Sequence, residues 1–238
     1  RVGAGAAMKG VIQSLLSARA DLACFSAAHG PVTVGMIRAS AARAKAALQP
    51  ASTPLFIHTH SAALFCAGLL VAAATGRRLS VLPQAQPGYL AEIGATPDAL
   101  LIDHGDTISL AFAGDDAALD GDDHVDLDFF TSGSTGAPKI VPKALAHLER
   151  EIRFWENEIG GRCDAMEATV SHQHVYGMLF RVVWPVMAAW PSRDVAALAW
   201  EQLEGGLGAR VALASSPAHL TRLPPQFALK DGPPAFIF

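Results

Sequence analysis

The sequence predicts an α/β protein in which layered, parallel-rich sheets carry flanking helices. Of its 238 residues, 51% are hydrophobic and 17% are charged, which excludes an intrinsically disordered chain. Short apolar runs typical of strands recur along the chain, and helical stretches separate several of them. The order strand, helix, strand indicates βαβ units and hence a mainly parallel sheet.

The first half of the chain contains two helices with recognisable ends. One is predicted over residues 33–48, with Thr33 as its N-cap. The other is predicted over residues 61–75, with Ser61 as its N-cap and Gly76 just beyond its end, where a left-handed residue is favoured. The strands of this half are expected at residues 55–57, 79–82, 100–102 and 108–113.

The second half begins with an alternating strand at residues 125–130 and a helix at 143–159. Gly160 and Gly161 end that helix, whose apolar residues recur at helical spacing. The remaining predicted elements are a helix-like apolar stretch at 178–190, a strand at 210–214, a short helix at 217–223 and a strand at 235–238. We expect the last strand to lie at a sheet edge, where a homodimer or another edge-strand association could form.

These elements suggest a division of the chain into three parts. Residues 1–7 are interpreted as a linker, 8–124 as a first α/β subdomain and 125–238 as the start of a second.

Composition excludes several functional classes. The formal charge of −4 shows no basic surplus, so nucleic acid is not an expected partner. The three cysteines are far apart and fit buried residues in a reducing cytoplasm. The longest near-apolar run, residues 62–74, is shorter than the roughly 18 residues that a membrane span needs.

An acidic segment occupies residues 115–128, where seven of fourteen residues are Asp. Carboxylates at this density could suggest a calcium loop, and Gly121 stands within the segment. No Glu closes such a loop, however, so a solvated acidic surface loop is the favoured interpretation.

The most informative segment is residues 131–139, TSGSTGAPK, which directly follows the strand predicted at 125–130. Gly133 and Gly136 permit backbone angles that let successive N–H groups point into one concavity. The hydroxyls of Thr131, Ser132, Ser134 and Thr135 add donors, and Lys139 adds a positive charge, as a polyphosphate requires. The pattern is neither a Walker A loop nor a GxGxxG turn. A flexible linker is the competing interpretation, which the preceding strand and the following Pro138 disfavour.

A second segment, residues 171–177, places two histidines before the apolar stretch at 178–190. An imidazole there can shape an acid pocket and partly balance a carboxylate. Metal binding by His172 and His174 is an alternative that lacks further ligands at useful spacing. A hydrogen-bonded core histidine is another. His58 and His60, which follow a predicted strand, are interpreted as structural.

The segment at 131–139 resembles the phosphate-binding signature of the adenylate-forming superfamily, which includes acyl-CoA and aryl-CoA synthetases. Every fixed position of TSGSTGxPK is matched. The resemblance implies the N-terminal part of that family's large α/β domain, with a loop that holds the β- and γ-phosphates of ATP. Ser132, Gly133, Ser134, Thr135 and Gly136 take that role together with Thr131 and Lys139.

Residues 171–177 resemble the family's next motif, an H-x-x-G arrangement beside the substrate carboxylate and the adenine pocket. His174 and Gly177 occupy the matching positions, and Tyr176 lies between them. The resemblance covers roughly residues 32–238, although its upstream part, around residues 76–83, is weak in identity.

The family carries further signatures that do not occur in these 238 residues. They are an aromatic-Gly-x-Thr-Glu segment, a ribose-binding Asp and a Lys on a small C-terminal domain; here no Thr is followed by Glu. We therefore expect an N-terminal portion, inactive or nearly so alone, with no complete catalytic set. Its parent is expected to use ATP and Mg²⁺, the Mg²⁺-binding Glu lying outside this chain.

The resemblance implies that the parent joins a small carboxylic acid to CoA or to the thiol of a carrier protein. The apolar residues around 178–184 favour an aromatic or a medium-to-long-chain acid, and packing in the core is the alternative interpretation. Two alternatives are a non-catalytic nucleotide- or partner-binding module and an unrelated phosphate-binding enzyme such as a kinase.

Overall fold

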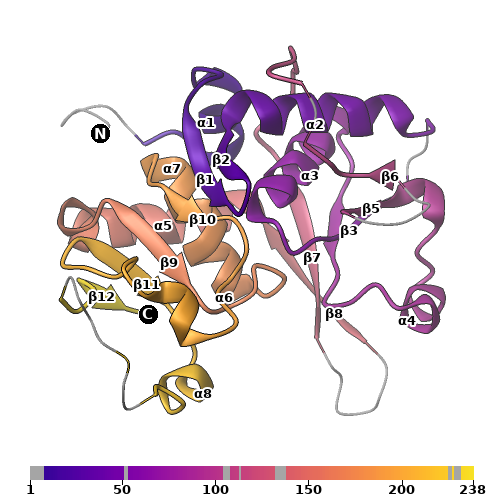
Figure 1. The fold of residues 1–238 in the computed structure, drawn as a ribbon. Coiled ribbons are helices and arrows are strands. Elements are labelled where there is room, and N and C mark those ends of the chain that lie inside the picture. Colours follow the sequence, from indigo (N-terminus) through magenta and orange to yellow (C-terminus); the bar gives the residue numbers. More distant parts are fainter. Residues whose placement is uncertain are drawn as a thin grey trace.

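The computed structural model describes residues 8–50, 53–103, 108–112, 114–131, 138–224, 227 and 232–238. Within these ranges the chain forms two six-stranded sheets with helices between and around them (Figure 1). Most neighbouring strands are parallel, which confirms the predicted α/β class.

Sheet I is built from residues 55–144 in the order β6-β5-β3-β4-β7-β8. Its strands are β3 (Leu55–His58), β4 (Leu79–Val81), β5 (Leu100–Ile102), β6 (Ile108–Ser109), β7 (Asp126–Thr131) and β8 (Lys139–Ala144). Four of the five strand predictions in this region are confirmed, at β3, β4, β5 and β7, whereas β6 ends earlier than predicted, at Ser109.

Strand β8 is absent from the sequence-based prediction. It pairs antiparallel with β7 over six residue pairs, from Asp126 opposite Ala144 to Thr131 opposite Lys139. The predicted helix start at residue 143 was therefore wrong, because Lys143 and Ala144 are held in the sheet. Helix α5 (Leu145–Ile159) begins only after them.

Sheet II combines the two ends of the chain, in the order β12-β11-β9-β10-β1-β2. Its strands are β1 (Ala23–Ala27), β2 (Gly30–Thr33), β9 (Ala165–Ala168), β10 (Ser192–Arg193), β11 (Val211–Ala214) and β12 (Phe236–Ile237). Each sheet thus takes strands from both sides of the boundary placed between residues 124 and 125. Strand β12 lies at the edge of the sheet, as expected.

The helices of the first half are α1 (Val11–Ser17), α2 (Val34–Ala47), α3 (Ala62–Thr75), α4 (Pro87–Glu92) and the 3₁₀ turn η1 (Pro97–Ala99). The predicted caps of α2 and α3 are confirmed. The hydroxyl of Thr33 accepts a hydrogen bond from the Met36 N–H at 3.3 Å, and that of Ser61 accepts one from Leu64 at 3.0 Å. Gly76 ends α3 with a φ of 63°.

Helix α3 is buried on all sides, because it contacts both β3 of sheet I and β1 of sheet II. Gly68 makes the packing against β3 possible. A β-carbon at this position would lie 2.2 Å from the Cδ1 atom of Ile57.

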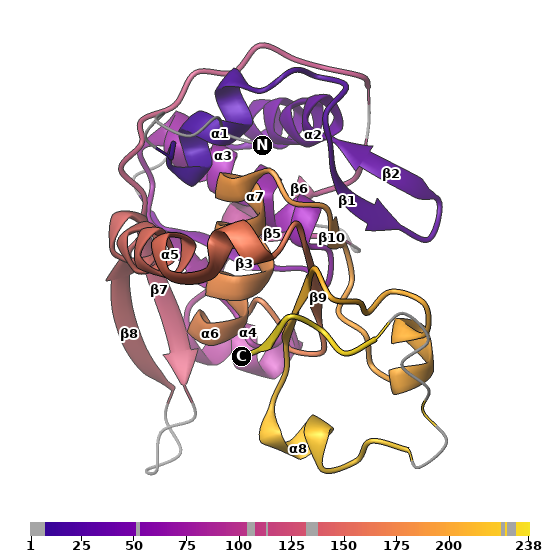
Figure 2. The same cartoon turned by 90° about the vertical axis from the view of Figure 1, so that its left-hand side faces the viewer.

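The helical elements of the second half, after α5, are η2 (Gly160–Arg162), α6 (Val175–Met178), the π-helical turn η3 (Leu179–Val183), α7 (Trp184–Ala188), η4 (Trp200–Leu203) and α8 (Pro217–Leu220). The α6–η3–α7 run forms most of the helical stretch predicted at 178–190. Two perpendicular views place α6 between the β7–β8 hairpin and strands β9 and β11 (Figures 1 and 2).

The acidic segment pairs several of its carboxylates with arginines. Asp116 lies 2.7 Å from Arg38, and Asp126 and Asp128 each lie 3.0 Å from Arg78. In the described ranges, no cluster of three or more His, Cys, Asp or Glu side chains is arranged to hold a metal ion. The helices in these ranges are also too short or too polar to cross a membrane.

A long-range cap fixes the N-terminal helix to α5. The Glu149 carboxylate accepts a hydrogen bond from the Val11 N–H, the first amide of α1, at 2.8 Å. Glu149 is only 8% exposed, and a β-carbon on Gly10 would lie 2.7 Å from its carboxylate oxygens. Because the amide is buried, it has no access to water if this acceptor is removed.

We expect Glu149→Ala to lower the free energy of unfolding by about 1–3 kcal/mol, the cost of leaving a buried donor unpaired. Urea unfolding followed by circular dichroism measures the change. Glu151→Ala, on an exposed position of the same helix, is the control and should stay within about 0.5 kcal/mol of the unsubstituted chain. Equal losses in both variants would contradict the capping role.

Candidate functional site

The candidate site lies where parallel strands of sheet I end. Strands β3, β4, β5 and β7 run in one direction, so their carboxyl ends share one edge of the sheet. Ligands of open α/β sheets bind at this edge. His58, Leu82 and Asp103 stand at the ends of β3, β4 and β5, and the predicted phosphate loop follows β7.

The predicted phosphate loop stands between β7 and β8 in the sequence. Its described ends, Thr131 and Lys139, pair across the hairpin, and the Thr131 hydroxyl donates to the Lys139 carbonyl at 3.3 Å. Both residues are exposed. The other predicted phosphate ligands lie outside the described residues: Ser132, Gly133, Ser134, Thr135 and Gly136.

Strand alternation determines which way these two ends face. Side chains two residues apart on a strand share a face, so Thr131 lies on the same face as Phe129. Phe129 belongs to the main core, whereas Phe130 belongs to a separate cluster on the opposite face. Thr131 and its cross-strand partner Lys139 therefore share the core-facing side of the hairpin, where α6 lies (Figure 2).

The second predicted segment follows β9 and leads into α6. His174 is the N-terminal boundary residue of α6, and its carbonyl accepts the Met178 N–H at 2.8 Å. The His174 side chain is exposed. Tyr176 is half-buried, and its hydroxyl donates to the Ser215 carbonyl at the end of β11 at 3.1 Å.

Gly177 allows the chain to fold closely back on itself. A β-carbon here would lie 2.0 Å from the Ser171 carbonyl oxygen and 2.6 Å from its carbon. Both are backbone atoms that cannot rotate away. The glycine of the H-x-x-G pattern is thus required by the turn that presents His174.

The preceding residue, Gln173, joins this segment to sheet I. Its Nε2 lies 3.2 Å from the Thr59 carbonyl and 3.1 Å from Nδ1 of His58. Its Oε1 accepts the hydroxyl of Ser171 at 2.8 Å. The sequence-based prediction did not include this residue in the site.

His172 is fully buried and takes no part in an exposed pair with His174. Its ring packs against Phe65 of α3, with 4.8 Å between ring centroids, and its Nδ1 accepts Nη1 of Arg181 at 2.8 Å. Arg181 in turn donates through Nη2 to the Asp194 carbonyl. These contacts favour the alternative of a core histidine.

Asp194 completes a buried polar network between the sheets. Its carboxylate accepts the Ser61 hydroxyl at 2.7 Å and the Ala63 N–H at 2.9 Å, at the N-terminus of α3. Burial lowers the pKa of Arg181 to about 10 and raises that of the Asp194 carboxyl. Burial, reinforced by the Arg181 charge, holds the pKa of His172 well below its usual range.

His58 is tied to the sheet, as its structural interpretation predicts. Its Nδ1 lies 3.1 Å from the Leu82 carbonyl, and burial lowers its pKa. The side chain of His60 is exposed, with its ring edge-on to His58 at 5.4 Å.

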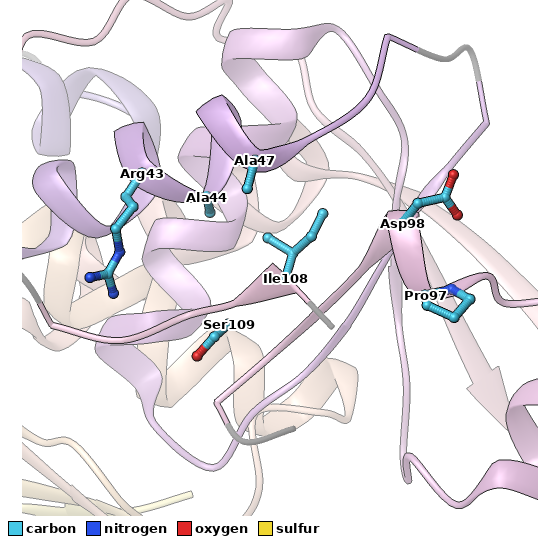
Figure 3. A pocket seen from close by; sticks show the side chains of 7 residues that line it. All are labelled: Arg43, Ala44, Ala47, Pro97, Asp98, Ile108 and Ser109. Atoms are coloured by element: carbon cyan, nitrogen blue, oxygen red, sulfur yellow. The ribbon is translucent and has the colours of Figure 1, made fainter. Parts of the chain in front are cut away.

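The cavity drawn in Figure 3 lies elsewhere in the fold. It has a volume of about 650 Å³ and is lined by Arg43 on α2, Asp98 in η1 and Ser109 on β6, among others. Because η1 leads into the amino end of β5, this cavity lies by that end and not at the carboxyl ends of β3, β4 and β7.

No family model matches the sequence, and no curated protein matches it. Among solved structures, the chain is similar to ATP-bound MatB from Rhodopseudomonas palustris, with a TM-score of 0.69 and 14% identity. That match covers 90% of this chain and 50% of MatB.

Two further structures are similar. One is o-succinylbenzoate CoA synthetase (MenE) from Bacillus subtilis in complex with its acyl-adenylate intermediate, with a TM-score of 0.66, 12% identity and coverage of 90% and 64% of the two chains. The other is an acyl-CoA synthetase from Brucella canis, with a TM-score of 0.65, 15% identity and coverage of 90% and 48%. The chain has the fold of the N-terminal part of acyl-CoA synthetases. It spans about half to two thirds of the length of these acyl-CoA synthetase structures.

We expect Gly177→Ala to lower the free energy of unfolding by about 1–3 kcal/mol, the usual cost of forcing an extra methyl group into a packed site. Urea unfolding is again the measurement. Gly161→Ala is the control, since a β-carbon there meets nothing within 4 Å. Equal stability of the two variants would contradict the close approach of α6 to Ser171.

The depressed pKa of His172 predicts a loss of stability in acid. Below the ordinary imidazole pKa near 6.5, His172 binds a proton in the unfolded chain but stays neutral where it is buried in the folded chain. The free energy of unfolding therefore falls as the pH decreases. One such proton contributes a slope of up to about 1.4 kcal/mol per pH unit.

Urea titrations between pH 7.5 and pH 5 measure this slope. His172→Gln should reduce this slope by the contribution of about one proton, up to about 1.4 kcal/mol per pH unit. His147→Gln, an exposed control, should leave the slope unchanged. A slope unaffected by His172→Gln would show that His172 does not cause the acid dependence.

Proposed function

We propose that the chain is the N-terminal part of an ATP-dependent carboxylic-acid ligase of the adenylate-forming family. The intact protein would form an acyl-adenylate and then an acyl thioester with CoA or a carrier-protein thiol. One observation carries the proposal: the TSGSTGAPK segment begins at the carboxyl end of β7, and its two described ends share the face toward α6, whose first turn presents His174. The similarity to CoA synthetases that bind ATP or an acyl-adenylate supports it.

In this proposal the two segments have different roles. The loop at 131–139 binds the β- and γ-phosphates through its N–H groups and hydroxyls, and Lys139 neutralises part of their charge. His174, with Tyr176 beside it, borders the acid and the adenine. The acid's carboxylate oxygen attacks the α-phosphorus, the bond to the bridging oxygen breaks, and pyrophosphate leaves.

Positioning and charge neutralisation supply most of the catalysis in such a reaction. Mg²⁺ would neutralise further phosphate charge, and the resemblance to the family implies that a Glu outside this chain holds it. We accordingly propose that the Mg²⁺ ligand lies outside these residues.

The apolar residues that suggested an aromatic or long-chain acid are part of the core. Met178, Phe180 and Trp184 are at most 5% exposed. They support the scaffold rather than line a pocket, so we limit the proposal to a carboxylic acid. Tyr176 remains the half-buried aromatic residue next to His174.

ATP–pyrophosphate exchange tests the proposed reaction. We expect acid-dependent exchange by the intact longer protein and little or none by the 238-residue chain. Robust exchange by the chain alone would contradict the expected need for further residues. Nucleotide binding by the longer protein without exchange for any acid in a broad panel would favour the alternative of a non-catalytic binding module.

We expect Lys139→Ala in the longer protein to raise the apparent KM for ATP about 10-fold or more, because a charge-assisted contact contributes about 1.5–3 kcal/mol. Lys143→Ala is a matched control at the far end of the same strand, opposite Leu127, and should leave the KM unchanged. An unchanged KM for the Lys139 variant would contradict the assignment of the phosphate loop.

A further inference from the structure

The segment that carries His174 has few direct hydrogen bonds to the sheet that carries the phosphate loop. His172 bonds to Arg181 in η3, which follows this segment. Tyr176 bonds to Ser215 at the end of β11 in sheet II. The Gln173 side chain reaches sheet I: its Nε2 donates to the Thr59 carbonyl, just after β3, and lies 3.1 Å from Nδ1 of His58.

We propose that Gln173 is a positioning residue that sets His174 relative to the phosphate loop. This inference rests on the proposed function and adds a residue through which the two halves of the site are aligned. Gln173 itself touches no reacting group. It acts through the residue that follows it in the chain.

Both the oxygen and the nitrogen of the Gln173 carboxamide have hydrogen-bond partners. One N–H donates to the Thr59 carbonyl and the oxygen accepts the Ser171 hydroxyl, while Nε2 also lies 3.1 Å from Nδ1 of His58. That ring nitrogen either accepts from Gln173 or donates to the Leu82 carbonyl, according to the tautomer. The residue is 7% exposed, so water cannot replace these partners freely. An apolar residue of similar length would fill the space but lose every one of the bonds.

We call the contacts of Gln173 with Thr59 and His58 the Gln173 clamp. They lie at the end of β3 and close to the end of β4. His58 ends β3, and its Nδ1 also lies near the carbonyl of Leu82, just after β4. Strand β4 pairs directly with β7, which the phosphate loop follows. Gln173 therefore ties the His174 segment to the sheet edge next to the loop.

Because Gln173 and His174 are adjacent in the chain, anchoring Gln173 also constrains the position of His174. Gln173 is buried and His174 is exposed. Anchoring the first side chain on the sheet directs the second out toward solvent at the carboxyl edge. A displacement of about 1 Å in such a group can reduce a rate by about 100-fold.

Kinetics of the longer protein test the positioning role. We expect Gln173→Met to lower kcat and raise the KM for the carboxylic acid, with a combined loss of about 10- to 100-fold in kcat/KM. In a His174→Ala background the same substitution should cause little further loss, because it acts through His174.

Gln202→Met is the control, at an exposed glutamine that also fixes a loop. Its Oε1 accepts the N–H groups of Leu198 and Ala199, neither of which belongs to the His174 segment. This variant should change neither kcat nor either KM. The inference would be overturned if the fold-losses in kcat/KM of Gln173→Met and His174→Ala multiply in the double variant. An equal loss of kcat/KM in Gln202→Met would also overturn it.

A second measurement separates this inference from the proposed function. Imidazole ¹H–¹⁵N spectra of the 238-residue chain report on each histidine without requiring activity. Gln173→Met should shift the His58 and His174 ring signals, whereas Gln202→Met should not. Unchanged His174 signals would overturn the positioning role even if exchange is found, and shifted signals support it even if exchange is absent.

Discussion

The fold depends on the contact between Asp194 and the N-terminus of α3. Asp194 lies just after β10 of sheet II, whereas α3 follows β3 of sheet I. Its carboxylate caps α3 through Ser61 and Ala63, and its backbone carbonyl accepts both the Ala62 N–H and Arg181. Burying a carboxylate is costly unless donors surround it, and here the helix end supplies them. The two sheets are thereby fixed with the ends of β3 and β10 together.

This constraint also explains why the two predicted motifs can serve one site. The phosphate loop belongs to sheet I, and the His174 segment follows β9 of sheet II, next to β10. Neither sheet contains both. The buried pair His172–Arg181, the Asp194 cap and the Gln173 clamp hold the exposed ends of the two motifs on a rigid frame, as binding residues on loops require.

Local sequence patterns were sufficient to predict the elements that residues nearby in the sequence stabilise. Helices α2 and α3 were predicted with their caps, because Thr33, Ser61 and Gly76 act on neighbouring residues. Strand β8 was missed because Pro142 and two lysines conceal its alternation, and its conformation depends on pairing with β7. The Asp194 and Gln173 contacts join residues more than 100 positions apart and leave no local pattern. Arg181 could have been found, since a charge within an apolar helical stretch requires a buried partner.

The central claim is that the loop after β7 and the segment after β9 form one nucleotide site. A titration of the 238-residue chain with MgATP, followed by backbone amide NMR, tests it most directly. We predict that the amides of Thr131, Lys139 and His174 shift together with a single dissociation constant. Shifts confined to one of the two segments, or to the cavity lined by Arg43 and Asp98, would contradict it.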